Sequence, residues 1–226
     1  MSEVYAAAPV PVHRLIPSQF PTVHLFDTVA TAADLKPVME LLGWTNDRLV
    51  AERIKRLPQN EWAYGRSNSS IVMASFLHVA PGGQRFNNAD LGAWYAAATL
   101  TTAVAEVGHH LRREAAARGL TGARRKYREY TSVLEGSYLD IRGQQALKAD
   151  IYSPSSYSAS QILGEAVRAS GGAGILYDSV RHAGGISIVA YRPPNVLDIT
   201  QGGHFNISVE VAANHIAVER LALPTG

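Results

Sequence analysis

Residues 92–119 read GAWYAAATLTTAVAEVGHHLRREAAARG and place a strand directly before a helix. Gly92 to Ala97 has the apolar and aromatic composition of a strand. Thr99 to Arg118 carries apolar residues on one helical face, and Gly119 is placed to end that helix. The apolar face consists of Leu100, Val104, Val107 and Leu111.

Further strands and helices are predicted on both sides of this unit. A two-residue apolar period predicts strands, and a helical period with start and stop signals predicts helices. The predicted strands are Val12 to Ile16, Ser69 to Ala80, Gly174 to Tyr177, Gly185 to Tyr191, and one or two within Phe205 to Leu223. The predicted helices are Thr31 to Leu42, Thr45 to Leu57, Gly122 to Glu135 and Ser160 to Ser170. Because strands and helices do not alternate regularly, we expect an α+β fold rather than a doubly wound sheet.

The composition limits the class of protein. With 226 residues, 46% of them hydrophobic, the chain can bury one sizeable core, which predicts a single domain. The formal net charge of +2 gives no reason to expect direct nucleic-acid binding. The absence of cysteine excludes disulfides and a cysteine nucleophile. No secretion signal or membrane-length apolar run is visible, so we expect a cytoplasmic protein without membrane contact.

Three segments far apart in the chain form an ordered set of motifs. They are VHRL at 12–15; GGQRFN at 82–87 with AWYA at 93–96 and AVAE at 103–106; and GILYDSVR at 174–181. In order and spacing they resemble the RES family, which is named for an Arg, Glu, Ser set of polar residues. Gln84 and Phe86 depart from the family's glycine-arginine motif, and a helical insertion at about 31–68 exceeds what a minimal member needs.

The resemblance implies a fold, a substrate and a partner. The implied fold is one RES domain over residues 1–226, with an ADP-ribosyltransferase-like mixed or antiparallel sheet and flanking helices. The implied function is that of a toxin in a bacterial toxin–antitoxin system, which degrades NAD+ by cleaving the nicotinamide–ribose glycosidic bond. NAD+ is then the substrate and no other cofactor is needed. The implied partner is an Xre-type helix-turn-helix antitoxin.

Glu106 is the expected catalytic residue. Cleavage between ribose and nicotinamide passes through an oxocarbenium-like state, which a fixed carboxylate stabilises. Nicotinamide leaves as a neutral molecule, so one glutamate suffices without a second acid. Glu106 lies on the flank of the apolar helix face, where it can face a cleft. The alternative is a surface glutamate paired with His110 one turn later.

Residues of the same motifs complete the expected site. Arg14 and Arg85 each offer a planar charged group to the NAD+ diphosphate, and the sequence does not rank them; either can instead form a surface ion pair. Tyr95, grouped with Arg14 and the catalytic glutamate, can stack on nicotinamide or bind a ribose hydroxyl, unless it belongs to the core. Ser179 can bind nicotinamide or ribose, or be an ordinary turn serine. Asn87 is a further expected substrate-binding residue.

Other functions stay open from the sequence. The acceptor can be water or inorganic phosphate, or a protein, which would make the chain a protein ADP-ribosyltransferase. A non-catalytic binding module is a third hypothesis, with a basic stretch as its surface. We expect that stretch to be a solvated helix face; it consists of Arg112, Arg113, Arg118, Arg124, Arg125, Lys126 and Arg128. The eight histidines form no His-x-x-x-His pair, so no metal site is expected.

Overall fold

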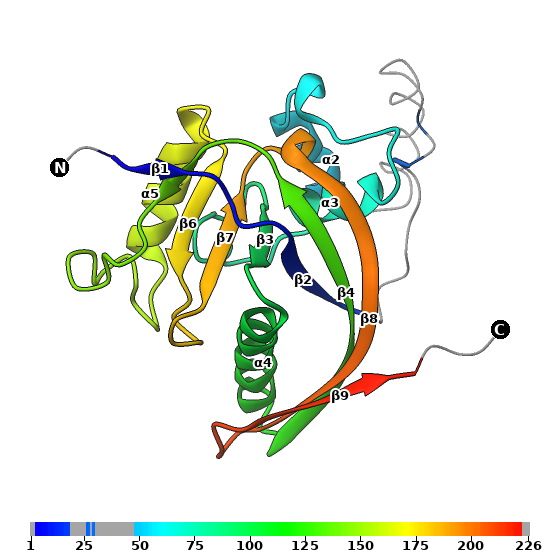
Figure 1. The fold of residues 1–226 in the computed structure, drawn as a ribbon, viewed down its shortest axis with the longest axis vertical. Coiled ribbons are helices and arrows are strands. Elements are labelled where there is room, and N and C mark those ends of the chain that lie inside the picture. The colour runs from blue at the N-terminus through cyan, green and yellow to red at the C-terminus, as the bar shows by residue number, and fades with distance from the viewer. Residues whose placement is uncertain (1–2, 19–25, 28, 30–47, 223–226) are drawn as a thin grey trace.

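The computed structural model describes residues 3–18, 26–27, 29 and 48–222, which form a sheet with helices on both faces (Figure 1). The strands are β1 (Tyr5–Ala6), β2 (Val12–Pro17), β3 (Trp94–Ala97), β4 (Gly122–Leu134), β5 (Tyr138–Asp140), β6 (Gly174–Asp178), β7 (Ile186–Ala190), β8 (Val196–Glu210) and β9 (Ile216–Leu221). The helices are α2 (Arg48–Arg56), α3 (Ser69–Leu77), α4 (Leu100–Ala117) and α5 (Ser158–Ala169), with short 3-10 helices η2 (Gln59–Glu61) and η3 (Pro193–Asn195). The predicted α+β fold is confirmed.

The sheet has nine strands among the described residues, in the order β1-β5-β6-β7-β3-β2-β4-β8-β9. β5 and β6 are parallel and the other neighbours are antiparallel, so the predicted mixed sheet is present. β2 and β3 pair at only one position, His13 with Ala97. We therefore call β1, β5, β6, β7 and β3 the first half of the sheet, and β2, β4, β8 and β9 the second half.

Alternate side chains of β3 enter cores on opposite faces of the sheet. Trp94 and Ala96 pack in one core with α3 residues such as Phe76. On the other face Ala97 packs in a core with α4 residues, and Tyr95 packs against the core beneath α5. α4 and α5 therefore cover the same face of the sheet, and α3 covers the opposite face.

α4 begins and ends where the sequence predicts. Thr99 Oγ1 accepts a hydrogen bond from the backbone N–H of Thr102 at 3.2 Å, which caps the helix. Gly119 has a φ of 69°, a left-handed conformation that favours glycine and ends helices. Ala98 and Thr99 alone separate β3 from α4, so this short connection fixes the position of Glu106 relative to the sheet.

The predicted helix at Gly122 to Glu135 is wrong, because β4 is a strand that pairs with both β2 and β8. Its arginines and lysine are good helix formers, and none of them is buried. The buried Tyr127 and Tyr130 are three residues apart, as on a helix face, but they lie on opposite faces of the strand, Tyr127 in the core with α4 and Tyr130 in the core with α3. Burial on both faces of the strand therefore imitates the helical period.

The predicted strand at Ser69 to Ala80 is also wrong, because Ser69–Leu77 forms α3. Asp27 accepts the backbone N–H groups of Asn68 and Ser70 at 2.9 and 2.8 Å and so caps the first turn. The alternating apolar residues belong to a helix that is buried over a wide face. Its buried residues follow helical spacing: Ser69, Ser70, Val72, Met73, Phe76 and Leu77.

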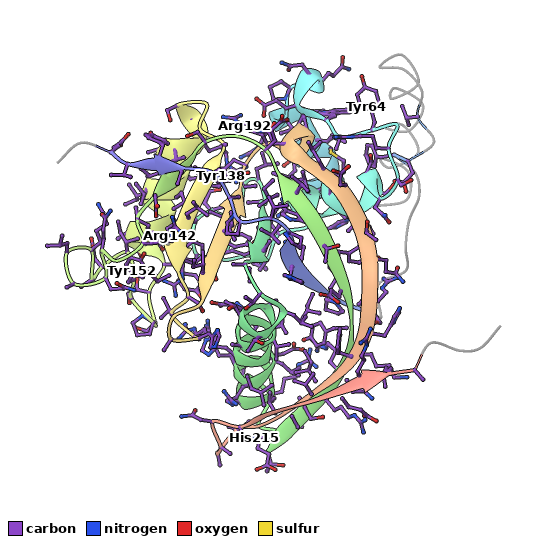
Figure 2. All side chains as sticks on the ribbon, viewed as in Figure 1. Tyr64, Tyr138, Arg142, Tyr152, Arg192 and His215 are labelled. Carbon is purple, nitrogen blue, oxygen red and sulfur yellow. The ribbon has the colours of Figure 1, made fainter. Side chains whose placement is uncertain are left out.

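The other predicted elements within the described ranges are confirmed, namely the strands β2, β3, β6 and β7 and the helix α5. Two strands are present near the C-terminus as predicted, but β8 begins at Val196, before the predicted start at Phe205. α2 ends just before Leu57, as predicted. The predicted helix from Thr31 to Leu42 and the predicted helix start at Thr45 lie outside the described residues. Arg192, labelled in Figure 2, attaches the described part of the expected insertion to the sheet by two hydrogen bonds to the Glu61 carboxylate, at 2.7 and 2.8 Å.

Candidate active site

A cleft of about 680 Å³ opens on the face of the sheet that α4 and α5 cover. Its floor includes one row of cross-strand neighbours: Tyr177 pairs with Ser187, Ser187 with Ala97, and Ala97 with His13. The row crosses from the first half of the sheet to the second. The walls come from α4, the loop after α3 and the segment before α5: Ala80, Gly82, Gly83, Gln84, Arg85, Ala103, Glu106, Val107, His110, Arg113, Glu114, Ala117 and Tyr157. This volume is typical of small-molecule sites.

Glu106 lies at the cleft on the flank of α4, where the sequence places it. Its Oε1 accepts a hydrogen bond from Ser179 Oγ at 2.6 Å. The same Oγ accepts the backbone N–H groups of Arg181 and His182, both at 3.1 Å. The hydrogen bond of Glu106 thus goes to Ser179 and not to His110, the alternative partner. Ser179 is absent from the cleft lining and acts as a positioning residue for Glu106.

The β6–β7 loop that contains Ser179 is fixed on the first turn of α4. His182 Nδ1 forms a hydrogen bond with Thr102 Oγ1 at 2.9 Å, and Ser179 N–H donates to the Gly185 carbonyl at 2.8 Å. A Cβ atom at Gly185 would come within 2.7 Å of both His182 Nδ1 and Thr102 Oγ1, so glycine allows this approach. The loop and the helix together hold the Glu106 carboxylate in place.

Tyr95 lines the cleft, and its hydroxyl is bonded within the protein. Oη donates to Asn87 Oδ1 at 2.8 Å and accepts the Phe86 N–H at 2.9 Å. Burial raises the pKa of Tyr95, so the hydroxyl stays protonated. Asn87 is fully buried, donates to the carbonyls of Asn88 and Leu91, and does not line the cleft. The structure places Asn87 as a support for Tyr95, whose ring is left to contact a ligand.

Arg14 lies at the boundary between β2 and β3, which we call the seam because the two strands pair there at only one position. Its Nη1 donates to the Tyr95 carbonyl at 2.8 Å, and its guanidinium lies 4.6 Å from the centroid of the Trp94 ring. Burial lowers the pKa of Arg14 to about 10, which leaves the group charged at neutral pH. Its buried Nε has no hydrogen-bond partner among the described residues. Arg14 also lines the cleft, so this charge can attract an anion.

Arg85 reaches the cleft from the loop after α3. Its Nη1 donates to the carbonyls of Ile151 and Ser153 at 3.2 and 3.0 Å. Its guanidinium lies 4.7 Å from the centroid of the Tyr157 ring. The loop turns at Gly83, where φ is 71° and a Cβ atom would collide with the backbone. Both predicted arginines therefore lie at the same cleft.

The cleft has an excess of positive charge. Within the described ranges, no carboxylate forms an ion pair with Arg14, Arg85 or Arg113. Burial, followed by the nearby Arg113 and Arg181, lowers the pKa of His110, so this histidine is neutral at pH 7. The lining carboxylate of Glu114 is neutralised by arginines, whereas that of Glu106 has no such partner. An anionic ligand therefore fits this cleft.

Sequence reasoning missed His13 and Glu129. His13 lines the cleft, and its Nδ1 lies 2.8 Å from Glu129 Oε1 although the two residues are 116 positions apart. Glu129 belongs to β4, where the sequence predicts a helix, so no local pattern connects the two. The one available signal is the place of His13 beside Arg14 in the first motif.

The basic stretch is not one helix face, contrary to the prediction, because it runs from α4 into β4. Its members point to different partners: Arg125 pairs with Glu114 of α4, and Arg124 with Glu219 of β9. In the part of the chain that the structure describes, no three His, Cys, Asp or Glu residues gather as metal ligands. No described helix has the length and apolar composition needed to cross a membrane.

The fold and the cleft define a class of α+β protein. In it, a glutamate held by a serine lies in the same cleft as arginines that have no ion-pair partner among the described residues, above a sheet whose two halves pair at a single position. The family follows from comparison with protein-family models, since the one described as RES domain matches residues 50–210, more than half of the chain. The chain belongs to the RES domain family. The match begins after β2, so Arg14 lies outside it.

Comparison with solved structures finds a similar chain in the crystal structure of the M. tuberculosis MbcT–MbcA toxin–antitoxin complex. The two chains are 23% identical with a TM-score of 0.41, and the alignment covers 58% of this chain and 74% of that chain. Comparison with curated proteins finds no match.

Proposed function

We propose that this chain is a toxin of a bacterial toxin–antitoxin pair, active in the cytoplasm, that degrades NAD+ at the nicotinamide–ribose bond. The observation that supports this function most directly is the Glu106 carboxylate. It accepts a hydrogen bond from Ser179 Oγ at 2.6 Å and lies in a cleft with excess positive charge. Membership of the RES domain family agrees with this function and with a fold related to ADP-ribosyltransferases.

Glu106 has the chemistry that this reaction needs. When the bond between ribose C1′ and the nicotinamide nitrogen breaks, its electron pair leaves with neutral nicotinamide and the ribose gains positive charge. A carboxylate fixed beside the ribose stabilises that charge. Ser179 is not the nucleophile, because its hydroxyl donates to Glu106 and accepts two backbone N–H groups. Its contribution is to keep Glu106 in one orientation.

The rest of NAD+ matches the other groups of the cleft. Arg14 and Arg85 supply guanidinium groups for the diphosphate, and neither is neutralised by a described carboxylate. The Tyr95 ring supplies an apolar face for nicotinamide. Because the Tyr95 hydroxyl is already bonded to Asn87, ring stacking is the interaction that it can offer.

The experiment that tests this function is incubation of the purified chain with NAD+, in which free nicotinamide and labelled protein are measured. Release of nicotinamide without labelled protein supports degradation, and a dependence on inorganic phosphate then identifies phosphate rather than water as the acceptor. ADP-ribose attached to protein supports a protein ADP-ribosyltransferase. No turnover contradicts the enzymatic proposal and leaves a non-catalytic binding module.

Two variants make the test specific for Glu106. Glu106→Gln removes the charge with little change of shape, and we expect the rate of nicotinamide release to fall about 100-fold or more. Glu135→Gln is the matched control, because Glu135 is exposed and lies outside the cleft lining. Near-normal activity in a folded Glu106→Gln protein would contradict the catalytic role of Glu106.

The partner that we propose is an Xre-type helix-turn-helix antitoxin with an acidic segment that covers the cleft. Carboxylates of such a segment can pair with Arg14 and Arg85, where the diphosphate of NAD+ otherwise lies. Antitoxin and NAD+ should then exclude each other, so added antitoxin should raise the apparent NAD+ requirement or abolish turnover. A ternary complex that binds NAD+ with undiminished affinity would rule out this blocking mechanism.

A further inference from the structure

His13 and Glu129 form a fixed pair at the second-half end of the cleft floor. His13 Nδ1 lies 2.8 Å from Glu129 Oε1, and the side chains are 21% and 12% exposed. Glu129 Oε2 accepts the Gly203 N–H at 3.3 Å, and a Cβ atom at Gly202 would come within 2.6 Å of the same oxygen. The β8 backbone therefore holds the carboxylate, and the carboxylate orients the imidazole.

This arrangement determines which nitrogen of neutral His13 can accept a proton. A carboxylate only accepts hydrogen bonds, so the proton of His13 lies on Nδ1 and Nε2 presents a lone pair. No group within the described ranges forms a hydrogen bond with Nε2. The cleft lining contains two histidines, and of these only His13 is oriented by a carboxylate; the other is His110.

Glu106 and His13 lie toward opposite ends of the floor row. Glu106 is fixed by Ser179, which directly follows β6, whereas His13 lies on β2. Strands of a sheet are about 4.8 Å apart, so the backbone of β7 at Ser187, which follows the Ser179 loop, lies about 10 Å from the backbone of β2 at His13. Glu106 and His13 therefore line one cleft from different halves of the sheet, with room for ribose and an attacking molecule between them, as water separates the two carboxylates of inverting glycosidases.

We propose that His13 is the general base that activates the acceptor, an inference that rests on the proposed NAD+ cleavage. The acceptor is a small molecule with an O–H group, namely water or hydrogen phosphate. Its proton passes to His13 Nε2, its oxygen forms the bond to ribose C1′, and the bond to nicotinamide breaks with its electron pair on the leaving nitrogen. Glu129 stabilises the imidazolium until His13 releases the proton to solvent.

The first test separates capture by the acceptor from departure of nicotinamide. In His13→Gln the ribosyl cation still forms, but water captures it slowly, so labelled nicotinamide can re-enter NAD+. We expect net NAD+ consumption to fall about 100-fold while exchange of labelled nicotinamide into NAD+ persists. His215→Gln is the matched control, since His215 is exposed, lies outside the cleft lining and is labelled at the foot of Figure 2.

The second test supplies a nucleophile that has no proton to lose. Azide should restore NAD+ consumption in His13→Ala, with ADP-ribosyl azide as the product, and should change the parent little. It should also act on Glu129→Gln, because the new amide can donate to Nδ1 and so stabilise the wrong tautomer of His13. Azide should leave Glu106→Gln inactive, because that variant lacks the charge that stabilises the ribosyl cation.

Three results would overturn the role of His13. The first is equal net consumption by the parent and His13→Gln. The second is an equal loss of consumption and exchange in a His13→Gln protein with the parental melting temperature, which would indicate substrate binding. The third is failure of azide to restore His13→Ala. Should His13→Gln or His13→Ala not fold, Glu129→Gln replaces that variant in its test. A parent that releases no nicotinamide instead rejects NAD+ cleavage itself, and the base with it.

Discussion

The two halves of the sheet differ in how deeply their strands are buried. In the first half, β6 and β7 each bury four of their five residues, because α5 covers one face and the core with α3 covers the other. In the second half, β4 buries only four of its 13 residues. The two halves are in register at a single pair, His13 and Ala97.

This difference explains which groups each half brings to the cleft. The densely packed half fixes one carboxylate, through the Ser179 loop that follows β6 and lies on α4. The second half brings His13 and Arg14 to the seam, where the backbone of β3 is not fully paired and the Tyr95 carbonyl accepts a guanidinium instead. Dense packing therefore supplies rigidity, and the incomplete pairing supplies the space and the positive charge.

The largest expected effect breaks the packing of the first half. A Cβ atom at Gly164 of α5 would come 1.9 Å from the Phe86 carbonyl oxygen and 2.6 Å from Tyr191 Oη. Gly164→Ala should therefore force α5 from the sheet and cost about 3 kcal/mol or more. For a chain of this length each kcal/mol lowers the melting temperature by about 2–4 °C. Thermal denaturation measures the effect.

Gly203→Ala in β8 is the matched change in the second half. Its Cβ atom would meet the buried Phe205 ring at 3.0 Å, a contact that a shift of a few tenths of an ångström relieves, and Arg220 Nε at 3.4 Å, which is an ordinary contact. Alanine is also preferred over glycine within a strand, so we expect a melting temperature close to that of the parent. Equal losses in Gly164→Ala and Gly203→Ala would show that the halves are packed equally tightly.

The same contrast decides how much of the fold can be predicted from sequence. Short apolar runs bounded by glycine, such as 174–178 and 186–190, are typical of strands buried on both faces, and β6 and β7 are predicted correctly. β4 carries charged residues such as Arg124 and Lys126 that favour helix locally. Its pairing with β2 and β8, which are distant in sequence, overrides that propensity.

The second prediction compares Arg14, at the seam between the two halves, with Arg85, which reaches the cleft from the loop after α3. Arg14→Lys removes the planar group that bonds the Tyr95 carbonyl and stacks on Trp94, so we expect a loss of about 1–2 kcal/mol and roughly tenfold weaker NAD+ binding. Arg85→Lys should lower the melting temperature less, because an ammonium can still reach the two carbonyls that Arg85 bonds. Denaturation and calorimetry with NAD+, in a Glu106→Gln background, measure both. Weaker NAD+ binding in Arg85→Lys alone would assign the diphosphate to Arg85 rather than Arg14.

The candidate site divides in the same way between what sequence predicts and what it does not. Motif spacing selects Glu106 and Ser179, and the structure brings them within 2.6 Å. Sequence does not give side-chain direction, so it assigns Asn87 to the ligand, whereas the structure places it behind Tyr95. The pair of His13 with Glu129 depends on the β2–β4 register, which no local pattern encodes.

The third prediction concerns the contact between α4 and the second half. Glu114 pairs with Arg125 of β4 at 2.9 Å, and this hydrogen bond lowers the pKa of Glu114 below its ordinary value of 4.5. Because the folded pKa is the lower one, the stabilisation is fully present above about pH 4.5 and is lost as pH falls through the folded pKa. Solvent screening limits it to about 1 kcal/mol or less.

Urea denaturation of the parent and Glu114→Gln at several pH values checks this prediction. We expect the difference in unfolding free energy to be largest near pH 7 and to shrink progressively as the pH falls below about 4.5. A difference that grows as the solution becomes more acidic would contradict the assigned cause. Added salt should reduce the difference at pH 7, because the pair is partly exposed.

The smallest expected effect lies one residue away, at Arg124. Successive side chains of a strand point to opposite faces, so Arg125 meets α4 while Arg124 meets Glu219 of β9. Arg124 and Glu219 are 60% and 62% exposed, against 23% and 32% for Arg125 and Glu114. Water screens the outer pair more, so a double-mutant cycle should give a coupling energy of about 0.5 kcal/mol or less for it, and a larger value for the inner pair. An outer coupling equal to the inner one would mean that burial against α4 does not decide the strength of ion pairs in the second half.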